Sequence, residues 1–248
     1  MSKGKTRAPS HIHSSLNGAI QRLLALYQRS DFTALEAGAR QFIQRFPNHV
    51  FGHKALIAAL LQLDKAEQAL VVANAAVERI PGDAELHVNR AAACIRCGQA
   101  ELALAAADEA IRLSPGNAGA HANKGLALKQ LGAWNPALEA YRRAIELNPS
   151  DHDSLTNAGI ALLELEMPQQ AQACFQAGIA LQPGDTEARN GLALAQEALK
   201  FLESARSELE SLLAQKPDDA EARSRLVQIL RQDCHFVDAE RETQRFLT

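Results

Sequence analysis

Aromatic residues and long apolar runs are scarce in this chain of 248 residues. Phe, Trp and Tyr together account for 4% of the residues, whereas hydrophobic residues as a whole account for 47%. The core must therefore come mainly from alanine and leucine, which favour helices, so the composition predicts an all-α protein and excludes a β class. No run of about 18 apolar residues and no secretory apolar segment is present, which disfavours a membrane span and secretion.

An excess of charge of one sign is also missing. The chain has 26 Lys and Arg residues, 29 Asp and Glu residues and a formal net charge of −3. Proteins that bind nucleic acid through its phosphates carry a cationic surface, so we expect no nucleic-acid partner. The one basic run, Lys3, Lys5 and Arg7, lies in residues 1–15, which we expect to form a disordered tail.

Cysteine is limited to four residues, Cys94, Cys97, Cys174 and Cys234, of which the first two form a C-x-x-C pair. Two ligands cannot complete a tetrahedral zinc site. Activated thiolates lie at helix N-termini, whereas this pair falls late in an expected helix. We therefore expect buried, reduced thiols, no metal or other cofactor, and a cytoplasmic protein.

Proline is sparse but regular. Six of the nine prolines follow one another at intervals of 34 residues, namely Pro47, Pro81, Pro115, Pro149, Pro183 and Pro217. A fixed period of this length indicates stacked helical pairs rather than a globular enzyme. The spacing divides the chain into repeats near residues 16–49, 50–83, 84–117, 118–151, 152–185, 186–219 and 220–248.

The last position of each repeat predicts a helix cap. It lies two residues after the periodic proline and holds a side chain that can accept a hydrogen bond from the start of the next helix: Asp83, Asn117, Asp151, Asp185 and Asp219. Such caps contribute about 1 kcal/mol each. His49 is the exception. Pro136 and Pro168 fall in the first turn of an expected second helix, where proline is tolerated.

Small residues recur where the two helices of a repeat must approach each other: Ala69, Ala103, Ala137, Ala171, Ala205 and Ala239. The most regular repeat, 118–151, contains Asn123, Gly125, Leu128, Gly132, Trp134, Ala137, Tyr141, Ala144 and Pro149 in order. Over residues 16–248 this pattern resembles the tetratricopeptide repeat family. The resemblance implies a right-handed superhelical solenoid of about seven helix-turn-helix repeats, and a non-catalytic scaffold for protein partners.

Two histidine-containing patterns are candidates for a metal site or a catalytic site. His53, His87 and His121 occupy equivalent positions, but stacked helices lie roughly 8 to 10 Å apart, so one metal cannot reach two of them. We expect these three histidines to be half-buried and to replace the aromatic residue that the family has at this position.

The segment 150–154 combines hydroxyl, imidazole and carboxylate groups at the start of an expected helix, where Asp151 is expected to act as the cap. With no phosphate loop, nucleophile elbow or H-E-x-x-H motif present, we expect no enzyme activity.

The family resemblance also places positions 2, 5, 6, 9, 12 and 13 of each repeat along a groove lined by first helices. Position 6 holds Asn89, Asn123 and Asn157. Their carboxamides can bond to the backbone of an extended peptide almost independently of its sequence, as in the asparagine ladder of protein O-GlcNAc transferases. The alternative is that asparagine is simply a common surface residue at this position.

Charged residues at these positions predict a groove that changes sign along its length. Lys54, Arg96 and Lys129 make the middle basic, and Glu164, Glu187 and Glu197 make the far end acidic. A charge-segmented peptide is therefore favoured as the partner. A carboxylate clamp for chaperone C-termini is incomplete, because Ala58, Gly119 and Asn123 replace three of its residues.

The segments at 23–28 and 46–56 are loosely similar to the leading repeats of bacterial proteins in which tetratricopeptide arrays precede a glycosyltransferase or sulfotransferase domain. This implies an alternative function, a substrate-recognition arm of a transferase system whose catalytic domain is not in this chain. Self-association through the repeat ends is a third reading. The acid-free opening also resembles a mitochondrial transit peptide, but residues 16–29 already fit the first repeat.

Overall fold

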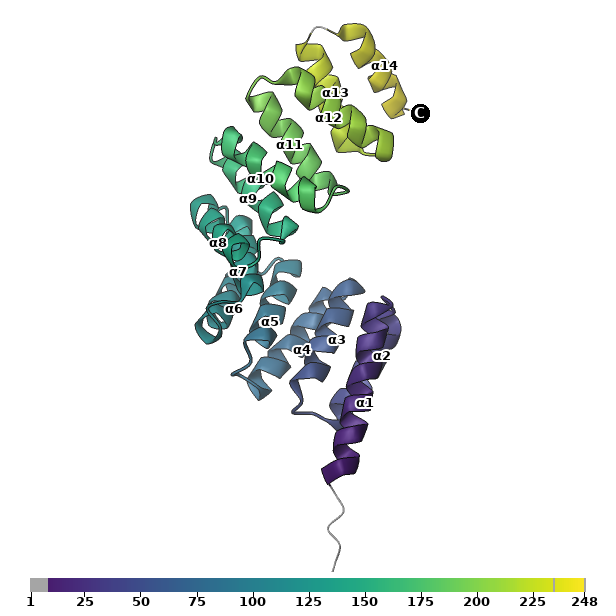
Figure 1. Ribbon diagram of the computed structural model, residues 1–248, viewed down its shortest axis with the longest axis vertical. Helices are drawn as coiled ribbons and strands as arrows, with labels where there is room; N and C mark the ends of the chain where they lie inside the picture. Colours follow the sequence, from purple (N-terminus) through teal and green to yellow (C-terminus); the bar gives the residue numbers. More distant parts are fainter. Residues whose placement is uncertain (1–8, 234, 248) are drawn as a thin grey trace, which may run out of the picture. The chain divides into compact units, whose positions relative to one another are not determined.

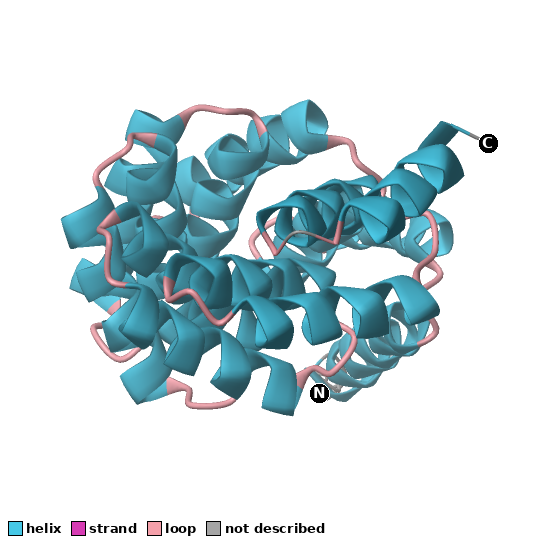
Figure 2. Ribbon diagram, turned by 90° about the horizontal axis from the view of Figure 1, so that it is seen from above, coloured by secondary structure: helices cyan, strands magenta, loops and turns pink. Residues whose placement is uncertain are grey.

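The computed structural model describes residues 9–233 and 235–247 of the chain (Figure 1). Over these residues the chain consists of helices joined by short turns, with no strand (Figure 2). The prediction of an all-α repeat array is confirmed. Odd-numbered helices are the first helices of their repeats, and even-numbered helices are the second.

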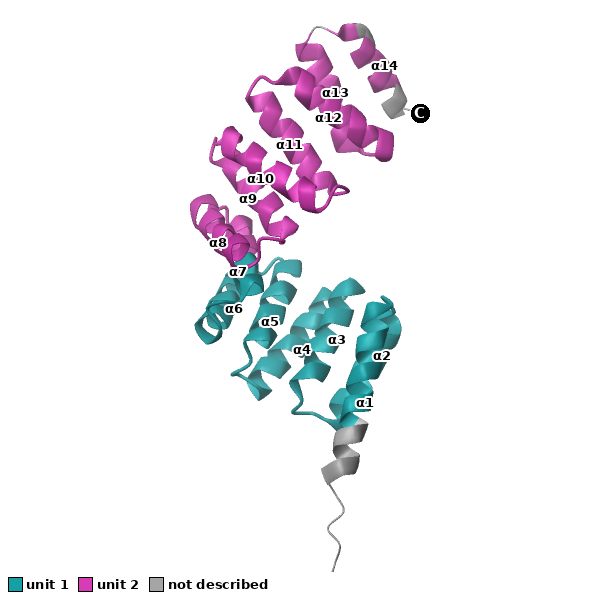
Figure 3. Ribbon diagram, in the orientation of Figure 1, with its two compact units in different colours: residues 1–123 teal, residues 124–248 magenta. Residues whose placement is uncertain are grey.

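The chain divides into two compact units, residues 1–123 and 124–248 (Figure 3). Unit 1 contains α1 (Pro9–Gln28), α2 (Phe32–Arg45), α3 (Val50–Gln62), α4 (Ala66–Arg79), α5 (Ala84–Arg96) and α6 (Ala100–Leu113). The boundary falls inside α7 (Ala118–Gln130). Unit 2 contains α8 (Trp134–Leu147), α9 (His152–Glu164), α10 (Pro168–Leu181), α11 (Thr186–Ala198), α12 (Leu202–Gln215), α13 (Ala220–Gln232) and α14 (Phe236–Leu247).

The N-terminal segment differs from expectation. Helix α1 begins at Pro9 rather than at Leu16, so residues 9–15 of the expected disordered tail are helical. Proline at the first position of a helix loses no hydrogen bond, because that N–H has no partner within the helix anyway. Residues 1–8 of the expected tail lie outside the described residues. The superhelical path and the single continuous domain stay predictions.

Within each unit a helix packs against the helices that precede and follow it in the chain. First helices also contact one another, so that α9, α11 and α13 form a continuous row in unit 2. The recurring alanines of the second helices are no more than 2% exposed: Ala69, Ala103, Ala137, Ala171, Ala205 and Ala239. Small side chains therefore lie where the sequence places the close helix contacts.

Two large rings pack against glycines in unit 2. A Cβ on Gly125 would lie 2.5 Å from the ring of Tyr141, and one on Gly159 would lie 2.7 Å from the ring of Phe175. Phe175 is completely buried and Tyr141 is 1% exposed. Glycine in the first helix thus provides the space that an aromatic ring from the second helix fills.

The predicted caps form. Asp83, Asn117, Asp151, Asp185 and Asp219 each accept a hydrogen bond from the backbone N–H three residues later, at 2.9 to 3.1 Å. At the exceptional position, His49 Nδ1 accepts from the N–H of Phe51 at 3.3 Å. Asp31 caps α2 in the same way, which the repeat pattern did not predict.

The turn between the two helices of a repeat contains one residue with positive φ, between 56° and 71°: Ser30, Asp64, Gly98, Gly132, Glu166 and Lys200. Only two of the six are glycine, although glycine adopts this conformation at the lowest cost. The turn is therefore imposed by the packing of the helices that flank it, and not by the local residue type.

The three equivalent histidines bind the previous proline turn. Nε2 of His53 lies 2.8 Å from the carbonyl oxygen of Pro47, and the matching distances are 2.9 Å for His87 and 3.0 Å for His121. His53 and His87 are buried, at 6% and 7% exposed, which confirms their structural reading. Because a carbonyl only accepts, Nε2 carries the proton in each case.

Arginine takes over this role in the last two repeats. Arg189 Nε donates to the carbonyl of Pro183 at 2.9 Å, and Arg223 donates to the carbonyl of Pro217. The fourth residue of the first helix thus acts as a donor to the periodic proline in five repeats. The interaction depends on a donor at that position and tolerates different side chains.

Replacing His53 with leucine should lower the free energy of unfolding by about 1 kcal/mol, because the Pro47 carbonyl loses its donor while apolar volume is kept. His121→Leu is the matched control, since its hydrogen bond is longer and more exposed, and its loss should cost less. Urea unfolding of both variants measures the difference. A larger loss in the control would contradict this account of the histidines.

Candidate functional site

Each predicted cation of the groove already has a partner within the chain, Lys54 at the end of its own repeat and the other two in an adjacent repeat. Nζ of Lys54 lies 3.0 Å from Oδ1 of Asp83. Arg96 Nη2 lies 2.6 Å from Oδ1 of Asp64 in the preceding turn. Lys129, in unit 2, donates to Oδ1 of Asn157 at 2.8 Å. A peptide carboxylate would have to displace an existing partner at each position.

The position-6 asparagines are also engaged to different degrees. Asn123 Nδ2 donates to the backbone carbonyl of Val88 at 3.0 Å. Asn157 donates to the carbonyl of Asp153 at 2.9 Å and accepts from Lys129. Asn89 is only partly buried. The Nδ2 donor of Asn123 and both polar atoms of Asn157 are therefore already bonded within the chain, and the asparagine ladder stays a prediction.

The predicted acidic end divides into two kinds of residue. Glu197 accepts hydrogen bonds from Nε2 of Gln232 at 2.7 Å and of Gln228 at 3.4 Å, which joins α11 to α13. Glu164 and Glu187 are exposed and have no ion-pair partner in the described part of the chain. These two carboxylates are available to a ligand.

A hollow of about 470 Å³ lies between the first helices α9, α11 and α13 of unit 2. We call it the first-helix hollow. Its lining residues are Ile160, Leu163, Glu164, Thr186, Glu187, Asn190, Gly191, Leu194, Asp219, Glu221 and Arg225. Most of these residues occupy the repeat positions that the family resemblance assigns to a groove. Glu164 and Glu187 both line this hollow.

Two polar atoms of this lining are buried without a hydrogen-bond partner in the described structure. They are Oδ1 of Asn190 and Nε of Arg225. Asn190 is only 6% exposed, and Arg225 uses another of its nitrogens to pair with Glu221 at 3.0 Å. A buried unpaired polar atom costs about 1–3 kcal/mol, so the lining offers one acceptor and one donor that a ligand can satisfy.

Sequence reasoning did not single out Asn190 or Arg225. Both lie at predicted groove positions, Asn190 at position 5 and Arg225 at position 6 of their repeats. That placement was the signal available to find them. The three asparagines in register give a stronger sequence signal, but two of them form hydrogen bonds within the chain.

The electrostatic character of the first-helix hollow is acidic. Four carboxylates line it, against the single guanidinium of Arg225. Asp219 is occupied as the cap of α13, and Glu221 pairs with Arg225. Burial raises the pKa of the Tyr141 hydroxyl, and the negative charge of Glu187 raises it further.

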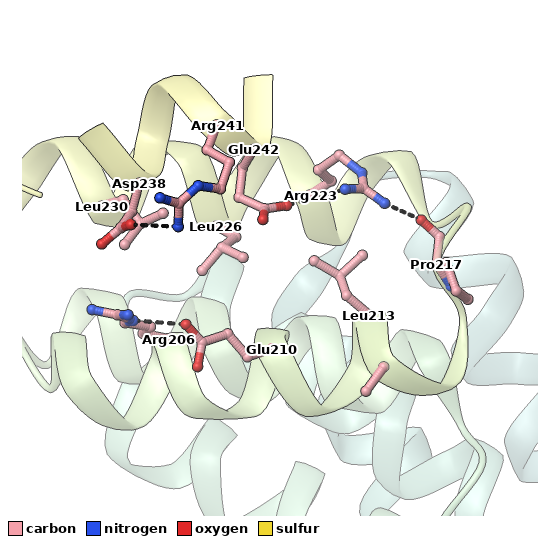
Figure 4. A pocket seen from close by; sticks show the side chains of 11 residues that line it. Arg206, Glu210, Leu213, Pro217, Arg223, Leu226, Leu230, Asp238, Arg241 and Glu242 are labelled. Carbon is pink, nitrogen blue, oxygen red and sulfur yellow. Dashed lines mark hydrogen bonds and ion pairs between the residues drawn. The ribbon is translucent and has the colours of Figure 1, made fainter. Parts of the chain in front are cut away.

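A second hollow, of about 540 Å³, lies between α12, α13 and α14 (Figure 4). Its floor is formed by Leu213, Leu226 and Leu230. The charged residues of its rim pair among themselves: Arg206 with Glu210, Arg223 with Glu242, and Arg241 with Asp238. Because these charges already pair with one another, a polar ligand would gain fewer new interactions here than in the first-helix hollow.

Other chemistry-bearing residues have structural roles. Asp151 accepts from both the backbone N–H and the hydroxyl of Ser154, at 3.1 and 2.6 Å, as the cap of α9. Cys94 is buried, and burial raises the pKa of its thiol and of the Cys97 thiol. Cys234 lies outside the described residues.

Among the residues with described placement, no group of three or more His, Cys, Asp or Glu side chains could hold a metal ion. The same residues include no helix that is both long and apolar enough to cross a membrane.

Comparison with family models gives three matches, each described as a tetratricopeptide repeat. They cover residues 118–151, 140–173 and 162–229. The comparison with curated proteins finds no match.

Solved structures share the fold at low sequence identity. YrrB, described as a TPR protein with an unusual peptide-binding site, is 23% identical over 71% of this chain and 90% of its own, with a TM-score of 0.61. PilF of Pseudomonas aeruginosa is 19% identical over 78% of this chain and 88% of its own, with a TM-score of 0.68. A chain of the APC/C hetero-tetramer Cut9–Hcn1 is 19% identical over 92% of this chain and 45% of its own, with a TM-score of 0.76.

The shape of the first-helix hollow depends on glycine at position 191. A Cβ there would lie 2.4 Å from the buried ring of Phe175, so Gly191→Ala should destabilise unit 2 by about 1–3 kcal/mol through overpacking. Gly184→Ala is the control, because a Cβ there meets nothing within 4 Å. Thermal unfolding of both variants tests the difference. Equal melting temperatures would show that the ring of Phe175 is free to move.

Proposed function

Since the chain is a tetratricopeptide repeat protein, we propose that it is a non-catalytic scaffold that binds extended segments of partner proteins along the row α9, α11 and α13. Repeat arrays of this kind serve as protein–protein interaction scaffolds, because stacked helices present a long surface of exposed first-helix residues. The proposal assigns the first-helix hollow of unit 2 as the contact site.

The observation that carries the proposal is the pair of unsatisfied atoms in the first-helix hollow. Oδ1 of Asn190 lacks a donor, and Nε of Arg225 lacks an acceptor. A peptide group supplies one N–H and one C=O, so an extended chain in the hollow can satisfy both. Such contacts bind the backbone and leave selectivity to the side chains around it.

The asparagines remain secondary contacts in this proposal. Asn123 keeps a free acceptor oxygen, because only its Nδ2 is bonded to Val88. Asn89, Lys54 and Arg96 are further candidate contacts of unit 1 by itself, and Lys129 is one of unit 2; each cation would first release its internal partner. The solved relative YrrB, with its described peptide-binding site, and the assembly Cut9–Hcn1 support peptide or protein partners in general terms.

The alternative function is a substrate-recognition arm of a glycosyltransferase or sulfotransferase system. It rests on the likeness of the opening repeats, and the internal bonds of Asn123 and Asn157 weaken the ladder on which it depends. A transferase encoded beside this chain would favour it. For location we propose the cytoplasm, because Cys94, Cys97 and Cys174 are free thiols and disulfides are rare in that compartment.

Site-specific photocrosslinking in cells of the source organism tests the contact face. A benzophenone amino acid at Leu194, which lines the first-helix hollow, should give protein adducts. The same probe at Leu181 is the matched control, since this residue lies on a second helix and is 45% exposed. Adducts from Leu181 alone would place partners on the second-helix face and refute the proposal.

A further inference from the structure

We propose that the segment bound in the first-helix hollow carries a lysine or arginine side chain, which is held by the carboxylates of Glu164 and Glu187. This inference rests on the proposed function, because it takes peptide binding in the hollow as given. It adds the chemical class of the ligand, a basic segment.

The first argument is the charge that remains unpaired. Glu164 on α9 and Glu187 on α11 line the hollow without an ion-pair partner in the described part of the chain. Elsewhere in unit 2, arginines on first helices already hold glutamates, such as Arg189 with Glu208 at 3.0 Å. Two carboxylates without a cationic partner make this part of the hollow negative, and a negative site attracts a cationic side chain.

The second argument is the apolar surface beside these carboxylates. Ile160, Leu163 and Leu194 line the same hollow and are each partly buried. Lysine and arginine have aliphatic stems that pack on apolar surface while their charged ends stay at the rim. The lining therefore matches both parts of a long basic side chain.

The third argument excludes an acidic ligand. Arg225 is the one cation in the lining, and its guanidinium is already paired with Glu221 at 3.0 Å. Its Nε can donate one hydrogen bond to a peptide carbonyl. The carboxylates around it repel an acidic side chain. The hollow therefore disfavours negatively charged ligands.

The test measures binding of three labelled peptides to the full chain by fluorescence anisotropy. The probes are nine-residue peptides of alternating alanine and one variable residue, which is lysine, norleucine or glutamate. Lysine and norleucine share the aliphatic stem, so their difference isolates the charge. We expect the order lysine, norleucine, glutamate, with a lysine advantage that shrinks as salt is added.

Two sets of variants separate this inference from the proposed function. Glu164→Gln with Glu187→Gln should weaken lysine-peptide binding by about tenfold and leave the norleucine peptide unchanged, as exposed ion pairs contribute a few-fold each. Glu139→Gln with Glu203→Gln is the matched control, because these exposed carboxylates on α8 and α12 lie outside the hollow. Asn190→Ala should weaken both peptides.

The outcomes are distinct. If the lysine and norleucine peptides bind equally and both depend on Asn190, the proposed function holds and the basic ligand is refuted. If neither peptide binds, or if Asn190→Ala changes nothing, the proposed function fails as well. Equal losses in the two glutamine double variants would show that only the net charge of the protein matters, which also overturns the inference.

Discussion

Each helix buries its apolar stripe against the helices next to it in the chain and, for first helices, against the first helix of the adjacent repeat, and the other features of the structure depend on that constraint. Alanines such as Ala103 and glycines such as Gly159 lie at these contacts because larger side chains would separate the helices. Stability is therefore a sum of local interfaces rather than the product of one central core. The first-helix row α9, α11 and α13 leaves the lining of the first-helix hollow uncovered by other helices of the described chain.

Polar contacts then join one repeat to the next. A donor on the first helix holds the preceding proline carbonyl, whether it comes from His53 or from Arg189. Ion pairs such as Arg96 with Asp64 make a further connection between adjacent repeats at the surface. The groove cations Lys54, Arg96 and Lys129 thus already have partners within the chain, whereas the first-helix hollow contains buried polar atoms without a partner in the described structure.

The sequence predicts the fold well because proline and the cap residues determine where helices begin and end through contacts with residues nearby in the chain. Helix starts and the caps at Asp83 and Asp185 follow from chain geometry that any helix shares. The helical residues 9–15 could not be read in the same way, since no periodic signal covers them. The site was harder still. Whether Asn123 bonds to Val88, or Asn190 is left without a partner, depends on how neighbouring repeats are placed, and spacing alone does not contain that information.

The central claim is that the row α9, α11 and α13 binds extended peptides through the first-helix hollow. Nuclear magnetic resonance of the labelled full chain, titrated with the alternating alanine and lysine peptide, tests it most directly. The account predicts shifts of the Asn190 side-chain amide and of backbone amides in these three helices, with α10 and α12 unchanged. Shifts confined to the second helices, or none at saturating peptide, would contradict it.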